Sequence, residues 1–83
     1  MLCNRTNLEL ASITLTDSSG VFTLPSVLPP GACAPLPDLA AGSYNLQFIE
    51  RGNGQAALCR REVSVVAGEA LAVAPDDGAR CTL

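Results

Sequence analysis

Residues 39–66, LAAGSYNLQFIERGNGQAALCRREVSVV, carry the clearest secondary-structure pattern in the chain. The first half alternates apolar and polar side chains, and its apolar set is Tyr44, Leu46 and Phe48. The second half, after the turn-forming Gly52-Asn53-Gly54, alternates again, and one of its faces carries Ala57, Cys59, Val63 and Val65. A period of two is the pattern of a β-strand with one buried face and one exposed face. The stretch therefore predicts a β-hairpin whose apolar face the rest of the chain must cover.

Shorter apolar segments, bounded by Gly, Pro, Asp or Ser, follow one another along the rest of the chain. We predict strands at 8–16, 21–24, 32–36, 69–74 and 80–83, and a turn at Pro29-Pro30-Gly31. In the first of these strands the apolar residues change parity, which indicates either a β-bulge near Leu10-Ala11 or burial on both faces. Six or seven short strands in a single domain, residues 1–83, predict an all-β fold, a small antiparallel β-sandwich.

The four cysteines, Cys3, Cys33, Cys59 and Cys81, predict cross-links. A chain of this size buries only about 60% of the surface that its unfolded form exposes, so two disulfides worth roughly 2 to 4 kcal/mol each would support a marginal core. Four free buried thiols and a Cys₄ metal site are the alternatives. We expect no metal and no cofactor, because the cysteines form no close pair and the chain has no His. Three pairings are possible; we favour Cys3–Cys81 and Cys33–Cys59, because terminal strands of sandwiches often lie side by side.

Two segments, VLPPGACAPLPDLAAGSYNLQFIERGNG (27–54) and REVSVVAGEALAV (61–73), carry a family resemblance. They resemble the transthyretin-like and carboxypeptidase-regulatory-like sandwich modules of secreted bacterial proteins, through the pattern L-x-x-L-x-x-G-x-Y-x-L-x-F over 36–48. A short polar segment before the first strand, residues 4–7, is similar to the start of small exported bacterial domains of this kind. The resemblance implies an Ig-like or transthyretin-like sandwich with a structural, adhesive or spacer role, and it implies no catalytic residues.

Catalytic groups are scarce in this sequence. The chain has no His and no Lys, which excludes the Ser-His-Asp, Cys-His and Ser-Lys arrangements. The plausible carboxylate pairs are Glu50 with Glu62 and Asp76 with Asp77, and we interpret the second pair as a solvated turn. We therefore predict that the protein is not an enzyme.

Charge and hydropathy exclude other classes. The net charge is −3, and Arg60-Arg61 is too small a cationic face for phosphates, so we expect no nucleic-acid partner. No apolar run reaches the roughly 20 residues that span a bilayer. The first six residues lack the features of a signal peptide, whereas the cysteines indicate an oxidising compartment. We expect an extracellular or periplasmic protein whose signal peptide is not in this chain.

Apolar residues make up 48% of the chain and charged residues 16%, which is more apolar surface than a small sandwich hides. We predict an exposed apolar patch in and around the proline-rich segment, made of Leu24, Val27, Leu28, Leu36 and Leu39. The pair Arg60 and Arg61 is a second candidate contact, because Arg61 shares the face of Cys59 and Val63. This arginine either reaches the rim of the sheet or pairs with an acid such as Glu50.

Together these features predict a non-catalytic structural or interaction module with a protein partner. It would be a subunit of a surface assembly or filament, or an accessory chain of a larger complex. The alternative is a small secreted inhibitor or ligand-binding domain that uses the rigid loop 25–37. Asn4-Arg5-Thr6 matches an N-glycosylation acceptor, and we interpret that match as chance.

Overall fold

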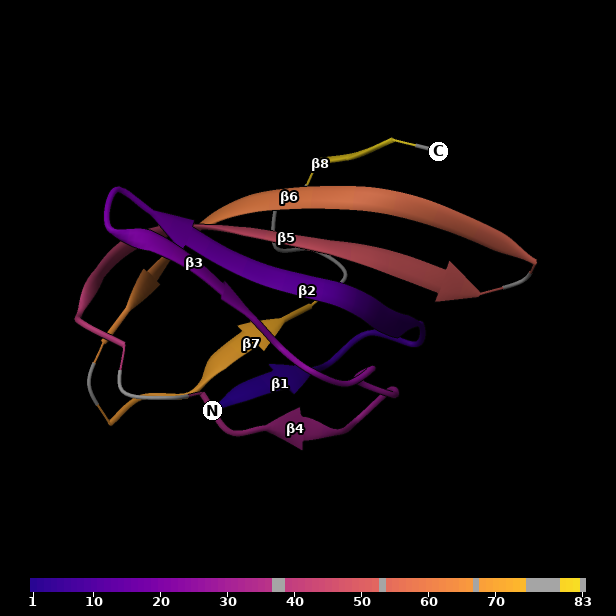
Figure 1. Cartoon of the computed structure of the whole chain (residues 1–83). Coiled ribbons are helices and arrows are strands. Elements are labelled where there is room, and N and C mark those ends of the chain that lie inside the picture. The colour runs from indigo at the N-terminus through magenta and orange to yellow at the C-terminus, as the bar shows by residue number, and fades with distance from the viewer. Residues whose placement is uncertain (37–38, 53, 67, 75–79, 83) are drawn as a thin grey trace.

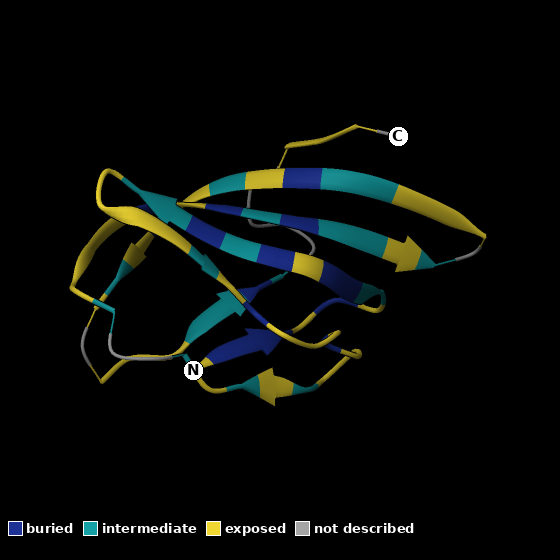
Figure 2. Cartoon of the chain, viewed as in Figure 1, coloured by how far each residue is buried: buried dark blue, intermediate teal, exposed yellow. Residues whose placement is uncertain are grey.

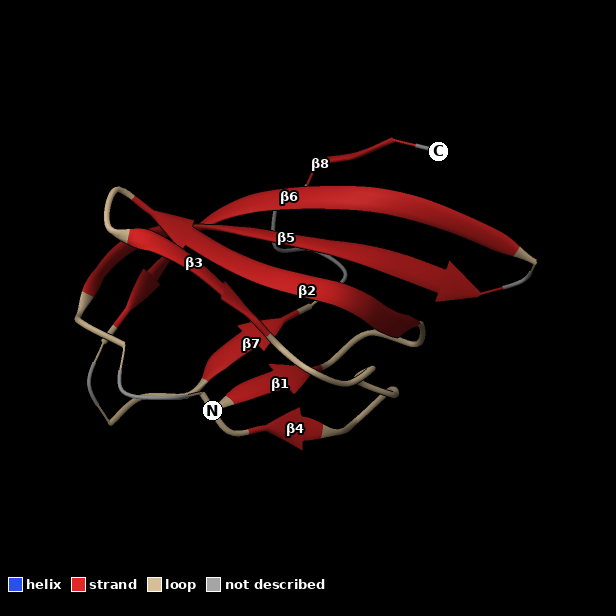
Figure 3. Ribbon diagram, viewed as in Figure 1, coloured by secondary structure: helices blue, strands red, loops and turns tan. Residues whose placement is uncertain are grey.

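The structure is a computed structural model, and it describes residues 1–36, 39–52, 54–66, 68–74 and 80–82. The described residues form strands and no helix, which confirms the all-β prediction (Figure 3). Eight strands lie within the described residues, more than the six or seven predicted: β1 (Leu2–Asn4), β2 (Glu9–Asp17), β3 (Gly20–Thr23), β4 (Cys33–Ala34), β5 (Gly42–Gly52), β6 (Gln55–Val65), β7 (Leu71–Val73) and β8 (Arg80–Thr82).

The strands form two sheets that pack as layers. Sheet A has the order β4-β1-β7, and sheet B has the order β3-β2-β5-β6-β8. In Figure 1 sheet B lies above sheet A, and the hairpin of β5 and β6 extends beyond it. Within the described residues β1 and β7 pair in parallel, whereas the other ladders are antiparallel.

The hairpin is the one that the sequence predicts. Strands β5 and β6 pair along their full lengths, from Gly42 opposite Val65 to Gly52 opposite Gln55. The alternation is confirmed as well, because Tyr44, Leu46 and Phe48 are buried while Ser43 and Asn45 are exposed. Asn53, at the centre of the predicted turn, lies outside the described residues.

Strand β2 contains a β-bulge, one of the two alternatives that its sequence indicates, displaced by one or two residues. Its register against β5 shifts between Ala11 and Thr14, and Ser12 has a φ of 51°, in the left-handed region. The extra residue changes the parity of the strand. As a result Leu10 and Ile13, which the sequence places on opposite faces, are both in the core.

The N-terminal segment differs from our expectation. It is not a polar lead-in, because β1 is the central strand of sheet A and Leu2, Cys3 and Asn4 are all buried. The edge strand β4 is shorter than the predicted 32–36, since Pro35 has no N–H to continue the ladder. The predicted turn before it is confirmed: the Ala32 N–H donates to the Pro29 carbonyl over 3.1 Å, and Gly31 has a φ of +79°.

The core lies between the two sheets. Figure 2 shows buried positions recurring along β2, β5 and β6 on sheet B and along β1 on sheet A. Phe48 is the largest fully buried side chain. The core cluster consists of Leu2, Leu10, Ile13, Leu15, Leu24, Leu28, Tyr44, Leu46, Phe48, Cys59, Val63 and Val73.

The two predicted disulfides are present, but the pairing that we favoured is wrong. Cys3 bonds to Cys33 and Cys59 bonds to Cys81, so neither bond joins the two terminal strands. The physical reason is strand placement: β1 lies beside β4 and β7 in sheet A, whereas β8 lies beside β6 in sheet B. Each disulfide joins residues directly opposite each other on neighbouring strands.

Asn4 is a buried polar residue that joins three segments. Its Nδ2 donates to the carbonyls of Leu8 (2.7 Å) and Leu28 (2.9 Å). Its Oδ1 accepts from the N–H of Thr6 (2.9 Å) and from Thr6 Oγ1 (2.6 Å). The side chain has 0% exposure, so the nitrogen that would carry a glycan is inaccessible in the folded chain. This burial agrees with our interpretation of the acceptor pattern as chance.

Candidate functional site

The apolar patch that we predicted around the proline-rich segment is largely inside the molecule. Leu24 and Leu28 are 5% and 3% exposed, so the expectation that they form surface is wrong. Leu28 is held there by a two-way backbone bridge to Leu10. Leu36 and Leu39 are partly buried and pack against the core, and Val27 is exposed. The prolines prevent a regular strand, but they do not prevent this segment from covering one side of the core.

The two arginines of the predicted contact point to opposite faces of sheet B. Arg60 is exposed and lies opposite Gln47 on β5 and Arg80 on β8. Arg61 is half-buried, and its Nη1 donates to the carbonyl of Ala72 on β7 over 3.1 Å. Arg61 therefore bridges sheet B to sheet A, a contact that neither of our two sequence interpretations included. Only Arg60 of this pair remains available on the outer face.

The outer face of sheet B, which faces away from sheet A, carries an apolar row. The register places Ile49 between Ala11 on β2 and Leu58 on β6, and these three residues define the outer row. Ala11 is buried and the other two are half-buried, but none of them belongs to the core cluster or packs against it. On either side of the row along the hairpin stand Arg51 and Arg60. An apolar centre with flanking arginines is the composition of many protein interfaces.

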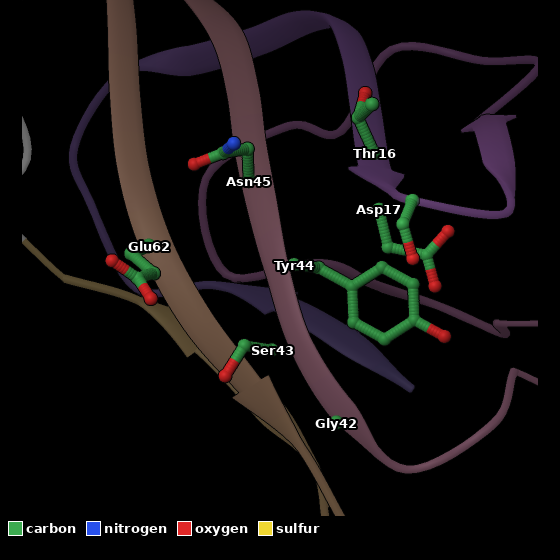
Figure 4. Close-up of a pocket in the computed structure, with 8 residues that line it drawn as sticks. Thr16, Asp17, Gly42, Ser43, Tyr44, Asn45 and Glu62 are labelled. Atoms are coloured by element: carbon green, nitrogen blue, oxygen red, sulfur yellow. The ribbon is translucent and has the colours of Figure 1, made fainter.

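An open pocket of about 550 Å³ lies at the end of sheet B where β5 begins. Figure 4 shows that its side chains do not converge: the Tyr44 ring lies beside Asp17 on one side of β5, while Asn45 and Glu62 point to the other side. The Tyr44 hydroxyl donates to the Ala40 carbonyl over 2.7 Å. Burial, followed by the charge of Asp17, raises the pKa of Tyr44. The pocket therefore has polar walls but no paired catalytic groups among its described residues.

Asp17 closes the turn between β2 and β3. Its Oδ1 accepts from Ser19 N (2.9 Å), Ser19 Oγ (2.8 Å) and Gly20 N (3.1 Å). The hydrogen bond from the Ser19 hydroxyl is the main reason that the pKa of Asp17 is below its ordinary value of 3.8. A lowered pKa means that the ionised form stabilises the fold above the ordinary value and that this stabilisation is lost as pH falls through the folded-state value.

Asp17→Asn should therefore lower the unfolding temperature near neutral pH and have a diminishing effect in acid. Asparagine keeps the shape of the turn but lacks the charge. Thermal unfolding followed by circular dichroism from pH 7 to about pH 2 measures the difference between variant and wild type. Glu69→Gln, at an exposed acid, serves as the control. A difference that is constant below the ordinary value of 3.8 would contradict the role of the ionised Asp17.

Of the two carboxylate pairs that the sequence suggests, the structure describes one. Glu50 and Glu62 are not brought together, because Glu50 lies opposite Ala57 and Glu62 lies opposite Asn45, well apart along the hairpin. Asp76 and Asp77 lie outside the described residues. Glu50 instead approaches the second disulfide: its Oε1 is 3.0 Å from Cys59 Sγ and 3.4 Å from Cys81 Sγ.

Sequence reasoning missed the outer row and the cluster of Glu50 with the second disulfide. Ile49 and Leu58 break the polar face of the hairpin, and this signal was visible in the alternation. The position of Glu50 on the same face as Phe48 was visible as well. Its approach to the sulfurs was not, because it depends on which cysteine lies beside Cys59.

Comparison with protein-family models, with curated proteins and with solved structures finds no match for this chain. Among the described residues, no helix is long and apolar enough to cross a membrane. The function must therefore be argued from the residues and contacts of this chain.

Proposed function

We propose that the protein is a non-catalytic structural module that acts by association with protein, as a subunit of an assembly built from copies of itself. The observation that carries this proposal is the outer row, Ala11, Ile49 and Leu58, which lies outside the core cluster and of which Ile49 and Leu58 are only half-buried. In a monomer this face would leave parts of Ile49, Leu58 and the stems of the flanking arginines next to water. A second copy on the same face would remove them from water.

The composition of the face supports association with protein. The apolar residues on it are aliphatic, and Arg60 stands beside them without an ion pair to any described residue. Arginine is enriched in protein interfaces, where its long stem packs and its guanidinium donates several hydrogen bonds. Symmetric association through one face also needs only a self-complementary patch, which is the commonest arrangement of soluble oligomers.

The proposed location is an extracellular or periplasmic compartment of a bacterium. The support for it is the two disulfides, which form and persist in oxidising environments. The resemblance of residues 36–48 to secreted sandwich modules agrees with the same location. The proposed absence of catalysis is supported by a sequence without His or Lys.

The inhibitor reading has less support than association. It requires loop 25–37 to present apolar side chains to a cleft, and Leu28 is buried in the core. Val27 remains exposed, but the backbone on its C-terminal side is fixed by the bridge between Leu28 and Leu10.

Leu58→Glu is expected to weaken self-association by about tenfold or more, because it places a charge within the apolar row. Light scattering after size exclusion, over a wide range of protein concentration, measures the oligomeric state. Ser64→Glu, at an exposed position of the same strand, is the matched control and should associate like wild type. A wild-type chain that stays monomeric throughout, or equal association by both variants, would contradict the proposal.

A further inference from the structure

Glu50 occupies an unusual position beside the disulfide of Cys59 and Cys81. It follows Phe48 on the face of β5 that points toward sheet A, and it is half-buried. Its Oε1 lies 3.0 Å from one sulfur and 3.4 Å from the other. The three potential ligand atoms lie within 4.8 Å of one another.

These contacts do not satisfy the carboxylate while the disulfide is intact. Two sulfurs bonded to each other carry no proton, so neither can donate a hydrogen bond to Glu50. The structure shows no ion pair to this carboxylate from a described arginine. In the oxidised form the half-buried carboxylate therefore receives no hydrogen bond from the two sulfurs. In the reduced form each sulfur carries an S–H group that can donate to it.

The attachment of β8, the strand that carries Cys81, depends on its disulfide. Strand β8 has three residues, all of them exposed, so packing contributes little to its attachment. Arg80 also lies directly opposite Arg60, and like charges at opposite positions of two strands repel. The bond between Cys59 and Cys81, at the neighbouring register position, holds these strands together.

We propose that Glu50, Cys59 and Cys81 form a redox-gated site for a thiophilic divalent cation of the zinc class. The site is closed while the disulfide exists and opens when a phosphine or thiol reductant breaks the S–S bond. A phosphine takes up oxygen from water and becomes the phosphine oxide, or two thiol groups of the reductant become a disulfide, while Cys59 and Cys81 receive two electrons and two protons. Binding of the cation then releases those two protons and leaves two thiolates and one carboxylate as ligands, with water at the fourth position.

The geometry allows this change. Two thiolates on a tetrahedral zinc stand about 3.8 Å apart, given a zinc–sulfur distance of about 2.3 Å. In this structure the sulfurs lie closer because they are bonded, and Cys81 is on an exposed edge strand that can move outward. The cation would replace the disulfide as the link between β6 and β8. The same three donors would also explain why an acid is placed at position 50.

Titration of the full chain with Cd²⁺, followed through the ultraviolet thiolate-to-cadmium band, tests the proposal. Oxidised wild type should show no band, and wild type reduced with a phosphine should bind Cd²⁺ most tightly at one site per chain. Glu50→Gln should weaken binding by about tenfold or more, because it removes a charged ligand. Glu62→Gln, on the outer face of the same hairpin, is the matched control and should bind like reduced wild type.

A second comparison tests the proposal even if reduction of both disulfides partly unfolds the chain. The double variants Cys59→Ser/Cys81→Ser and Cys3→Ser/Cys33→Ser each keep two thiols after reduction, but only the second keeps the proposed site. The second should retain the affinity of wild type and the first should lose about tenfold or more. Equal affinity in the two double variants, or equal affinity of Glu50→Gln and Glu62→Gln, would overturn the proposal, because binding would then belong to thiols in general.

Discussion

Asn4→Ala is expected to lower the free energy of unfolding by about 3 kcal/mol. The substitution removes four hydrogen bonds at a side chain with no exposure. It also leaves a cavity beside the carbonyls of Leu8 and Leu28, whose remaining donors are Thr6 Oγ1 and the N–H of Leu10. Buried polar groups that lose a partner bear the full cost of their desolvation, which is why the effect exceeds that of an ordinary hydrogen bond.

Urea unfolding followed by circular dichroism measures this change. Asn7→Ala is the matched control, since Asn7 is exposed and follows Asn4 by three positions; its effect should be under about 0.5 kcal/mol. Asn4→Asp adds a sharper test, because a buried carboxylate would face the carbonyls of Leu8 and Leu28 without a proton to donate. That variant should regain stability as the pH falls and the carboxyl becomes neutral. Similar effects of the alanine variants at positions 4 and 7 would contradict the role given to Asn4.

Removal of the bond between Cys3 and Cys33 is expected to cost about 3 to 5 kcal/mol, enough to unfold much of a small domain at body temperature. The bond restricts a segment of 30 residues in the unfolded chain and fixes β4 beside β1 in the folded one. Ala32, Ala34 and Leu36 around β4 pack against the core, so detachment of this strand also exposes apolar surface.

Removal of the bond between Cys59 and Cys81 should cost less, about 2 to 3 kcal/mol. This bond restricts a segment of 22 residues, but the strand that it fixes has no buried residue. The two double alanine variants can be compared by denaturant unfolding without reductant, since each keeps one disulfide. A larger loss for the second variant would show that β8 contributes more to the fold than its exposure indicates.

The sequence predicts correctly those elements whose side-chain pattern lies within one short stretch of the chain. The hairpin of β5 and β6 is confirmed because apolar and polar side chains alternate along much of both strands, which leaves little freedom in the register. The bulge in β2 is one of the two arrangements that the change of parity between Leu10 and Ile13 indicates. The presence of two disulfides follows from the need of a small core for cross-links.

The errors concern features that depend on distant partners. Strand β1 has only three residues, and its polar Asn4 is buried through partners that no local pattern reveals. The disulfide pairing depends on which strands are neighbours, and no local pattern indicates the parallel pairing of β1 with β7. Leu24 and Leu28 were predicted at the surface because prolines surround them, but proline restricts hydrogen bonding and not burial.

The parallel pairing of β1 with β7 has a consequence for folding kinetics. Leu2 lies opposite Leu71, near the other end of the chain, so sheet A is completed only after most of the chain has been synthesised. Contacts between residues so far apart in sequence slow the search for the native state, as they do in other β-rich domains. Until β7 arrives, one edge of β1 is unpaired and open to pairing with another chain. Early oxidation of Cys3 with Cys33 would hold β1 against β4 during that interval, so the rate of disulfide formation should govern how much of the protein reaches its native state rather than aggregating.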